Sequence, residues 1–214
     1  MKKVLMTLAL VAVAATSAFA QISVGAGYLA NTQKSTYTSG STSTTTTTPS
    51  AGFYVGADYT LDLGQGLGLV AGLKGNFLFN KEEGSITLPI LGTFTGTSKT
   101  SEIYLVVPVL ANYTYALSND LKLFGFAGPS FAYGLSSKTK STTNTSDDVT
   151  ITDNYGDSSN YGKVNLFLGA GVGVDVMNTI RIKAGYDIGL LDRDGRDDYK
   201  INDAQWYVGV AYLF

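Results

Sequence analysis

The chain has 214 residues, of which only 15% are charged, with a net charge of −2 and neither cysteine nor histidine. This composition excludes disulfide scaffolds, thiolate metal sites and thiol nucleophiles, and it removes the commonest general base and metal ligand. The weakly negative charge offers no basic surface to nucleic acid, so we expect no nucleic-acid partner.

Residues 1–20 have the three parts of a secretory signal peptide. Lys2 and Lys3 give a positive start, residues 4–15 form an apolar run, and Ala18-Phe19-Ala20 is a cleavage site of the small-x-small type. The apolar run is shorter than the ~20 residues that a membrane-spanning helix needs. We therefore predict an exported protein whose single domain is residues 21–214.

This domain consists of stretches in which apolar residues alternate with small or polar ones at a period of two, as in β-strands with one apolar face. Eight strands are predicted, at residues 21–30, 51–63, 67–80, 102–117, 121–135, 162–176, 180–191 and 204–214. Three short turns, 64–66, 118–120 and 177–179, alternate with four long polar connections, 31–50, 81–101, 136–161 and 192–203. Both ends of the domain therefore lie at the end that carries the short turns.

The alternation of short and long connections predicts an all-β fold, an eight-stranded antiparallel up-and-down transmembrane β-barrel. The polar face carries glycine, alanine, asparagine and threonine rather than the lysine and glutamate that coat a soluble sheet. The apolar face has aromatic residues near the strand ends, as in the aromatic girdles of membrane proteins. They are Tyr28, Tyr59, Phe79, Tyr113, Tyr115, Trp206 and Tyr212.

Two of the long connections have features of their own. Residues 35–50 are almost entirely serine and threonine, so we expect a solvated, mobile loop that buries too little apolar surface to become ordered. Residues 85–96 could be a ninth strand. If they crossed the membrane alone, every later long connection would change sides, so we predict that they extend a hairpin above the membrane.

The last strand alternates Trp206, Val208, Val210 and Tyr212 and ends at Phe214. Together with the signal peptide, this strand resembles the small outer-membrane β-barrel proteins of Gram-negative bacteria, the porin-family or OmpX-like set. The resemblance covers the whole of residues 21–214. It implies a place in the cell outer membrane, contact with outer-membrane lipid, and recognition of the C-terminal aromatic residues by the barrel-assembly machinery.

Four acidic and four basic residues fall on the polar face of the predicted strands. They are Asp58, Asp62, Lys74, Lys122, Asp175, Arg181, Lys183 and Asp187. Eight strands leave an interior about wide enough for side chains to fill, and buried charges need partners. We predict a salt-bridge network that plugs the lumen, in which Asp175 and Arg181 pair across neighbouring strands. A gated ion path lined by the same groups is the alternative.

The last long connection carries the acidic residues Asp192, Asp194 and Asp198. Carboxylates are the ligands that Ca²⁺ prefers, so these residues form a candidate metal site. Their spacing departs from that of an EF-hand, and a solvated loop is the favoured interpretation. We expect no resident cofactor.

The sequence predicts a protein without enzymatic activity. Known outer-membrane barrel enzymes depend on histidine, which this chain lacks. The favoured role is a structural or surface-interaction barrel with a packed lumen and long polar loops. The alternatives are a porin for small solutes or ions and an accessory subunit of an envelope or secretion complex. The surface ligand or protein partner stays open.

Overall fold

The computed structural model describes residues 20–88, 92–144, 146–156 and 161–214. The predicted signal peptide lies outside the described residues, apart from Ala20. The described strands are β1 (Ala20–Ser39), β2 (Thr42–Gly64), β3 (Leu67–Leu88), β4 (Gly92–Ala116), β5 (Leu121–Thr143), β6 (Ser146–Asp153), β7 (Val164–Val176), β8 (Ile180–Gly189) and β9 (Tyr199–Leu213). Among the described residues there is no helix long and apolar enough to cross a membrane.

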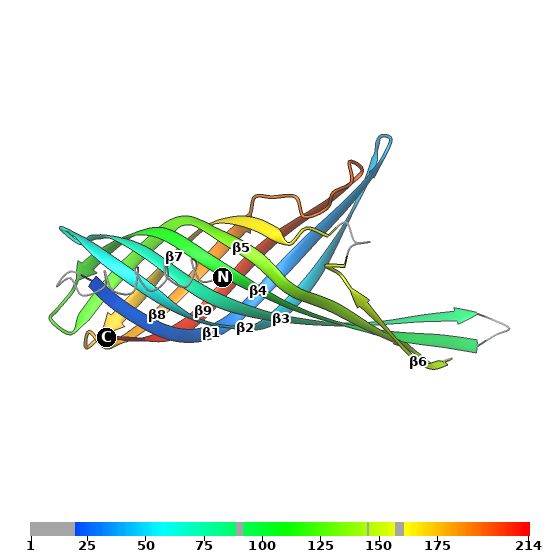
Figure 1. Cartoon of the computed structure of the whole chain (residues 1–214), viewed down its shortest axis with the longest axis horizontal. Coiled ribbons are helices and arrows are strands. Elements are labelled where there is room, and N and C mark those ends of the chain that lie inside the picture. The colour runs from blue at the N-terminus through cyan, green and yellow to red at the C-terminus, as the bar shows by residue number, and fades with distance from the viewer. Residues whose placement is uncertain (1–19, 89–91, 145, 157–160) are drawn as a thin grey trace, which may run out of the picture.

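Eight of these strands form a closed antiparallel ring. Each strand pairs with its neighbours in the chain, except that β5 pairs with β7, and β1 pairs with β9 to close the ring. The beginning of β1 and the C-terminus lie at the end of the ring that carries the short turns (Figure 1). The predicted eight-stranded antiparallel ring is confirmed, and its closure leaves no free strand edge around the wall.

The remaining strand, β6, was not predicted. It lies within the long connection 136–161 and pairs with β5 alone, from Lys138 opposite Asp153 to Thr142 opposite Val149. Since β6 stands outside the ring, it leaves the order of the ring unchanged.

The serine- and threonine-rich tract is a hairpin rather than the mobile loop that we predicted. β1 and β2 stay paired through it, from Asn31 opposite Ser50 to Ser39 opposite Thr42. The prediction was wrong because it counted only the apolar surface that the tract could bury. Threonine is β-branched and favours extended backbone, and each strand of the tract satisfies the backbone groups of the other.

The predicted extension of the β3–β4 hairpin is confirmed, because Ser85 lies opposite Thr95 in the same continuous register.

Beyond the ring the sheet divides into two arms. β2 and β3 remain paired only as far as Ala51 and Phe79, and β5 and β7 only as far as Tyr133 and Val164. The first arm consists of residues 31–39, 42–50 and 199–203, from β1, β2 and β9. The second arm consists of residues 80–88, 92–101, 136–143 and 146–153, from β3, β4, β5 and β6. Figure 1 shows the two arms diverging from the rim.

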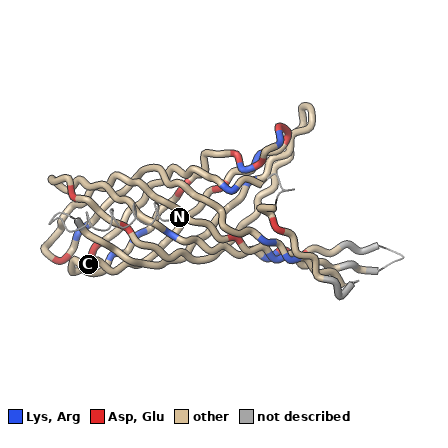
Figure 2. The backbone as a smooth tube through the Cα atoms, in the orientation of Figure 1, with Lys and Arg blue, Asp and Glu red and all other residues tan. Residues whose placement is uncertain are grey.

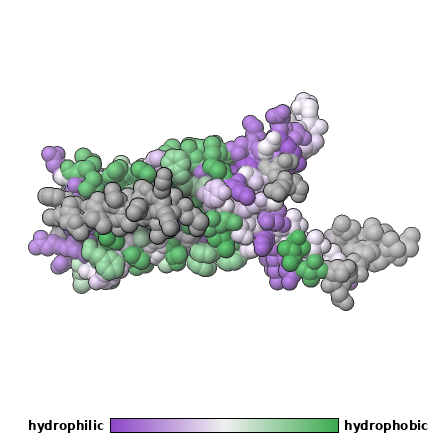
Figure 3. Space-filling model, in the orientation of Figure 1, coloured by the Kyte–Doolittle hydropathy of each residue, from purple (hydrophilic) through white to green (hydrophobic). Residues whose placement is uncertain are grey.

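The outer and inner faces of the ring carry the side chains that the period-two pattern assigns to them. Outward residues such as Val24, Val172 and Val210 are half exposed or more, and Figure 3 shows apolar residues over the ring and polar ones over the first arm. Inward residues such as Tyr54 and Phe167 are buried. The core of the protein is therefore the lumen itself.

Candidate functional site

The end of the lumen nearest the short turns holds a buried ion pair. Asp175 on β7 lies opposite Arg181 on β8. Arg181 donates from Nε and Nη2 to the two carboxylate oxygens of Asp175, at 2.7 and 2.8 Å, and its guanidinium lies 4.5 Å from the centroid of the Phe124 ring. Such two-pronged contacts between charged groups are the strongest side-chain hydrogen bonds. The predicted cross-strand pair is confirmed.

The middle of the lumen is crossed by a second ion pair. Lys183 on β8 donates to Asp58 on β2 at 2.5 Å, although the ring separates these strands by β1 and β9. Lys74 lies 5.8 Å from the ring centroid of Tyr54 and 5.2 Å from that of Tyr207, within the range of a cation–π interaction. Charges and rings from opposite walls therefore fill this layer together.

Glycine on the inner wall makes room for these rings. A Cβ atom at position 209 would lie only 2.0 Å from the hydroxyl oxygen of Tyr54. The glycines on the polar face of the strands are thus the counterpart of the large rings that pack against them.

A third layer joins three strands by hydrogen bonds. Gln205 on β9 donates from Nε2 to Asp187 on β8 at 2.8 Å, and the hydroxyl of Tyr104 on β4 donates to Oε1 of Gln205 at 2.7 Å. All three side chains are buried.

Two of the predicted inward charges lie at the margin of this network. Asp62 is exposed, and its carboxylate accepts a hydrogen bond from the backbone N–H of Gly64 at 2.8 Å. It caps the β2–β3 turn because β2 has already left the lumen at this point. Lys122 on β5 is half-buried and lies opposite Asp175 on β7. It forms no ion pair with any residue that the structure describes.

The opposite end of the lumen, below the arms, is closed by a cluster centred on Arg193. This residue of the β8–β9 connection donates from Nη1 to Asp203 and from Nη2 to Glu102, each at 2.8 Å. Its guanidinium lies 4.2 Å from the centroid of the Tyr161 ring. The hydroxyl of Tyr155 donates to Glu102 at 2.6 Å. We call Arg193, Glu102, Asp203, Tyr155 and Tyr161 the Arg193 cluster.

The charges around Arg193 and Tyr155 keep both groups protonated, so that they can donate the hydrogen bonds of the Arg193 cluster. Burial would by itself lower the pKa of Arg193, but the nearby carboxylate charges of Glu102 and Asp203 raise it above its ordinary value. Burial, together with the charge of Glu102, raises the pKa of Tyr155. At neutral pH the guanidinium therefore stays charged and the phenol remains a hydrogen-bond donor.

No pattern in the sequence predicts the Arg193 cluster. Its members come from two loops and two strands, and Glu102 and Arg193 are 91 positions apart. Arg193 also follows directly on the acidic residue Asp192, so its sequence surroundings indicate a solvated charged loop. Only the closure of the ring brings these residues together.

The candidate metal residues are not brought together. Asp192 accepts hydrogen bonds from the backbone N–H groups of Asp194 and Ile201, at 3.0 and 2.9 Å. Asp194 accepts two hydrogen bonds from the guanidinium of Arg196, at 2.9 and 2.8 Å, which lower the pKa of Asp194. No group of three or more potential metal ligands occurs among the described residues. The carboxylates of Asp192 and Asp194 instead hold the conformation of their own loop.

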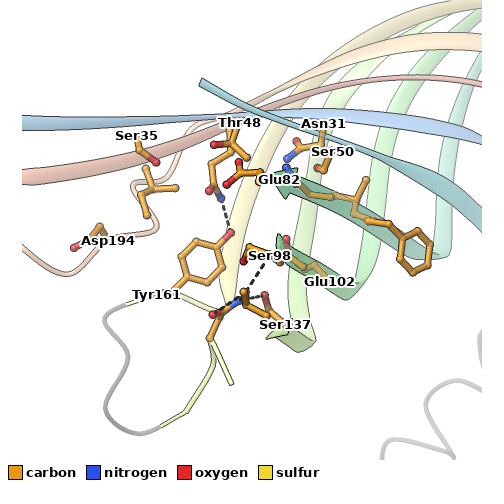
Figure 4. A pocket seen from close by; sticks show the side chains of 18 of the residues that line it. Asn31, Ser35, Thr48, Ser50, Glu82, Ser98, Glu102, Ser137, Tyr161 and Asp194 are labelled. Atoms are coloured by element: carbon orange, nitrogen blue, oxygen red, sulfur yellow. Dashed lines mark hydrogen bonds between the residues drawn. The ribbon is translucent and has the colours of Figure 1, made fainter. Parts of the chain in front are cut away.

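A polar cavity of about 540 Å³ lies between the two arms, above the Arg193 cluster. We call it the vestibule. Its wall is built from hydroxyl and amide side chains of both arms, with carboxylates at Glu82, Glu102 and Asp194. Figure 4 shows Tyr161 between the arms, where its hydroxyl accepts a hydrogen bond from Nε2 of Gln33 at 2.7 Å.

The lumen below the vestibule is filled. Three cavities along it have volumes of about 10, 20 and 10 Å³, and a volume of this size holds about one water molecule. The vestibule therefore ends at the Arg193 cluster and does not continue into a water-filled path.

A protein-family model described as the outer membrane protein beta-barrel domain matches residues 15–195. The chain belongs to this family, and it is a transmembrane β-barrel of the Gram-negative outer membrane. In barrels of this kind the short turns face the periplasm and the long connections face outward, so we expect the arms and the vestibule on the extracellular side. No curated protein matches the chain.

Several solved structures are similar to the chain. One is Ail, the attachment invasion locus protein of Yersinia pestis, with 16% identity and a TM-score of 0.37, covering 91% of this chain and 98% of that one. OprG of Pseudomonas aeruginosa has 13% identity and a TM-score of 0.43, covering 92% and 96%. The outer membrane protease OmpT of Escherichia coli has 10% identity and a TM-score of 0.39, covering 93% and 98%. Because these TM-scores are low, the family assignment depends on the family model alone.

Proposed function

We propose that this protein is a non-enzymatic outer-membrane barrel with a packed, non-conducting lumen, whose extracellular arms and vestibule contact molecules at the cell surface. The observation that carries the proposal is the filling of the lumen. Ion pairs, rings and hydrogen-bonded amides reach across it in successive layers, and the spaces between them hold about one water molecule each.

The vestibule supports a role in contact rather than in catalysis. Two of its three carboxylates are already held by arginines, Glu102 by Arg193 and Asp194 by Arg196. A general base must be free to accept a proton. The chain also has no histidine to serve instead.

Conductance in planar bilayers tests the proposal. We expect the purified barrel to give no steady, reproducible channels. A porin with an open lumen, reconstituted in the same bilayers, is the positive control, and it shows that the assay detects a conducting barrel. Steady channels from the unmodified protein would favour a porin instead.

We also propose that Phe214 and Tyr212 form the signal by which the barrel-assembly machinery recognises this protein. The two rings pack edge to face, with centroids 4.8 Å apart, and are 72% and 52% exposed on the outer face of the closing strand. They are therefore accessible where the last strand ends.

Replacing Phe214 with aspartate should lower the amount of inserted barrel in cells several-fold, while the purified chain still refolds in detergent. Heat-modifiable gel mobility of the outer-membrane fraction measures the inserted form. Tyr115→Asp is the matched control, since Tyr115 is an equally exposed ring near the short turns on another strand. An equal loss from both variants, or insertion unchanged by Phe214→Asp, would contradict the signal.

A further inference from the structure

Three lysines stand side by side on the outer face of the second arm. In the register of the sheet Lys81 on β3 lies opposite Lys99 on β4, and Lys99 lies opposite Lys140 on β5. Neighbouring strands are about 4.8 Å apart, so the three side chains start from one short row. Lys138 lies two residues before Lys140, on the same face. We call these four residues the lysine patch, and Figure 2 shows basic residues gathered near the base of this arm.

The face to which the lysines belong follows from the vestibule. Ser98, Thr100 and Glu102 line the vestibule from β4. Because side chains alternate along a strand, Lys99 must point the other way. The patch therefore lies outside the arm, away from the polar cavity.

The lysine patch has too little opposite charge around it. Lys81 pairs with Glu83 at 2.5 Å, but both side chains are more than half exposed. Asp153 also lies beside the patch, opposite Lys138. Lys99, Lys138 and Lys140 form no ion pair with any acidic side chain that the structure describes. Like charges directly opposite each other destabilise a sheet, so the row lowers the stability of the arm unless an anion lies against it.

The lysine patch lies at the level of the lipid headgroups, just beyond the exposed rings at the rim of the barrel. Phe79, 52% exposed, points outward two residues before Lys81 on β3. At a rise of about 3.4 Å per residue the lysine stands ~7 Å beyond this ring. Exposed rings at a barrel rim mark the boundary between hydrocarbon and headgroups, so the ammonium groups reach the headgroup layer.

A neighbouring side chain also suits a lipid surface. Ile151 on β6 lies directly opposite Lys140 and is 67% exposed. The exposed apolar side chain can contact the apolar part of a lipid, and the ammonium groups beside it can contact the charged headgroup.

We propose that the lysine patch binds the phosphate groups of lipid headgroups in the outer leaflet of the outer membrane. Lysine is a compact cation that commonly binds phosphate, and basic residues near a membrane surface attract anionic lipids. Binding holds the second arm against the membrane surface and offsets the repulsion within the row. The site is separate from both the lumen and the vestibule.

The test measures lipid retention by the protein purified in a neutral detergent, with native mass spectrometry as the readout. The probes are bisphosphorylated lipid A and the same lipid without its phosphates. The phosphorylated lipid should bind more tightly, and salt should weaken the binding. Lys99→Gln combined with Lys140→Gln should lower its affinity about 30-fold, the effect expected from removing two lysines at an anionic lipid surface.

Lys34→Gln combined with Lys200→Gln is the matched control. It removes the same charge from the outer face of the first arm, where Lys34 lies opposite Asn202 and Lys200 lies opposite Thr36, so that no two lysines face each other. This control should retain the phosphorylated lipid. Lys99→Arg with Lys140→Arg, which keeps both charges, should also retain it.

Three results would overturn the proposal. One is equal binding of the two lipids by the unmodified protein, a comparison that needs no variant to fold. The second is unchanged affinity in the Lys99 and Lys140 glutamine variant. The third is an equal loss of affinity in the first-arm control, which would show that overall charge and not the patch attracts the lipid.

Discussion

Replacing Asp175 with alanine should lower the free energy of unfolding of the barrel by about 3–5 kcal/mol, the usual effect of leaving one partner of a buried ion pair alone. Asp175 and Arg181 are only 5% and 6% exposed, and Arg181 makes its two charge-assisted hydrogen bonds to this carboxylate. The loss can be measured by denaturant unfolding in detergent micelles, followed by the fluorescence of Trp206.

Removing both charges distinguishes a stranded charge from a simple loss of packing. Asp175→Ala combined with Arg181→Met should recover part of the lost stability, because no buried charge is then left unpaired. Asp62→Ala is the control, since it removes an exposed carboxylate with one backbone hydrogen bond and should reduce stability by about 1 kcal/mol or less. A more stable barrel after the single change at Asp175 would show that this side chain faces lipid.

Replacing Arg193 with methionine should have a comparable effect at the extracellular end. The change leaves Glu102 and Asp203 close together without the guanidinium that bridges them, and we expect a loss of about 3–5 kcal/mol. Since Arg193 also contacts the rings of the β6–β7 connection, that connection and the β8–β9 connection should open. Hydrogen exchange of residues 153–156 and 190–198 should rise before the ring itself unfolds.

Arg196→Met is the matched control for this experiment. Arg196 belongs to the same loop and pairs with Asp194; its side chain is 51% exposed, whereas that of Asp194 is 3% exposed. After the change Asp194 still accepts a hydrogen bond from the backbone N–H of residue 196 at 3.0 Å, so we expect a smaller loss of stability than in Arg193→Met. Both connections should therefore keep their protection in this variant. If Arg193→Met exchanges no faster than Arg196→Met, the Arg193 cluster does not hold the lumen closed.

Features that depend on neighbours along the chain follow from the amino-acid sequence alone. A strand between lipid and a packed lumen must alternate its side chains, so the period of two assigns Val172 outward and Asp175 inward without further information. The even number of crossings follows from the alternation of short and long connections. The Asp175–Arg181 pair was also predictable, because a tight turn sets the register of the two strands that it joins.

Contacts that depend on which walls of the barrel face each other follow only from the closed ring. Lys183 reaches Asp58, and Arg193 reaches Glu102, only because the closed ring brings strands together that are about a hundred positions apart in the chain. Three further features could not be predicted from one segment either: the serine- and threonine-rich hairpin, β6 and the lysine patch. Their order and alignment come from strand partners beyond the ring, and a pattern within one segment carries no information about which strand will lie beside it.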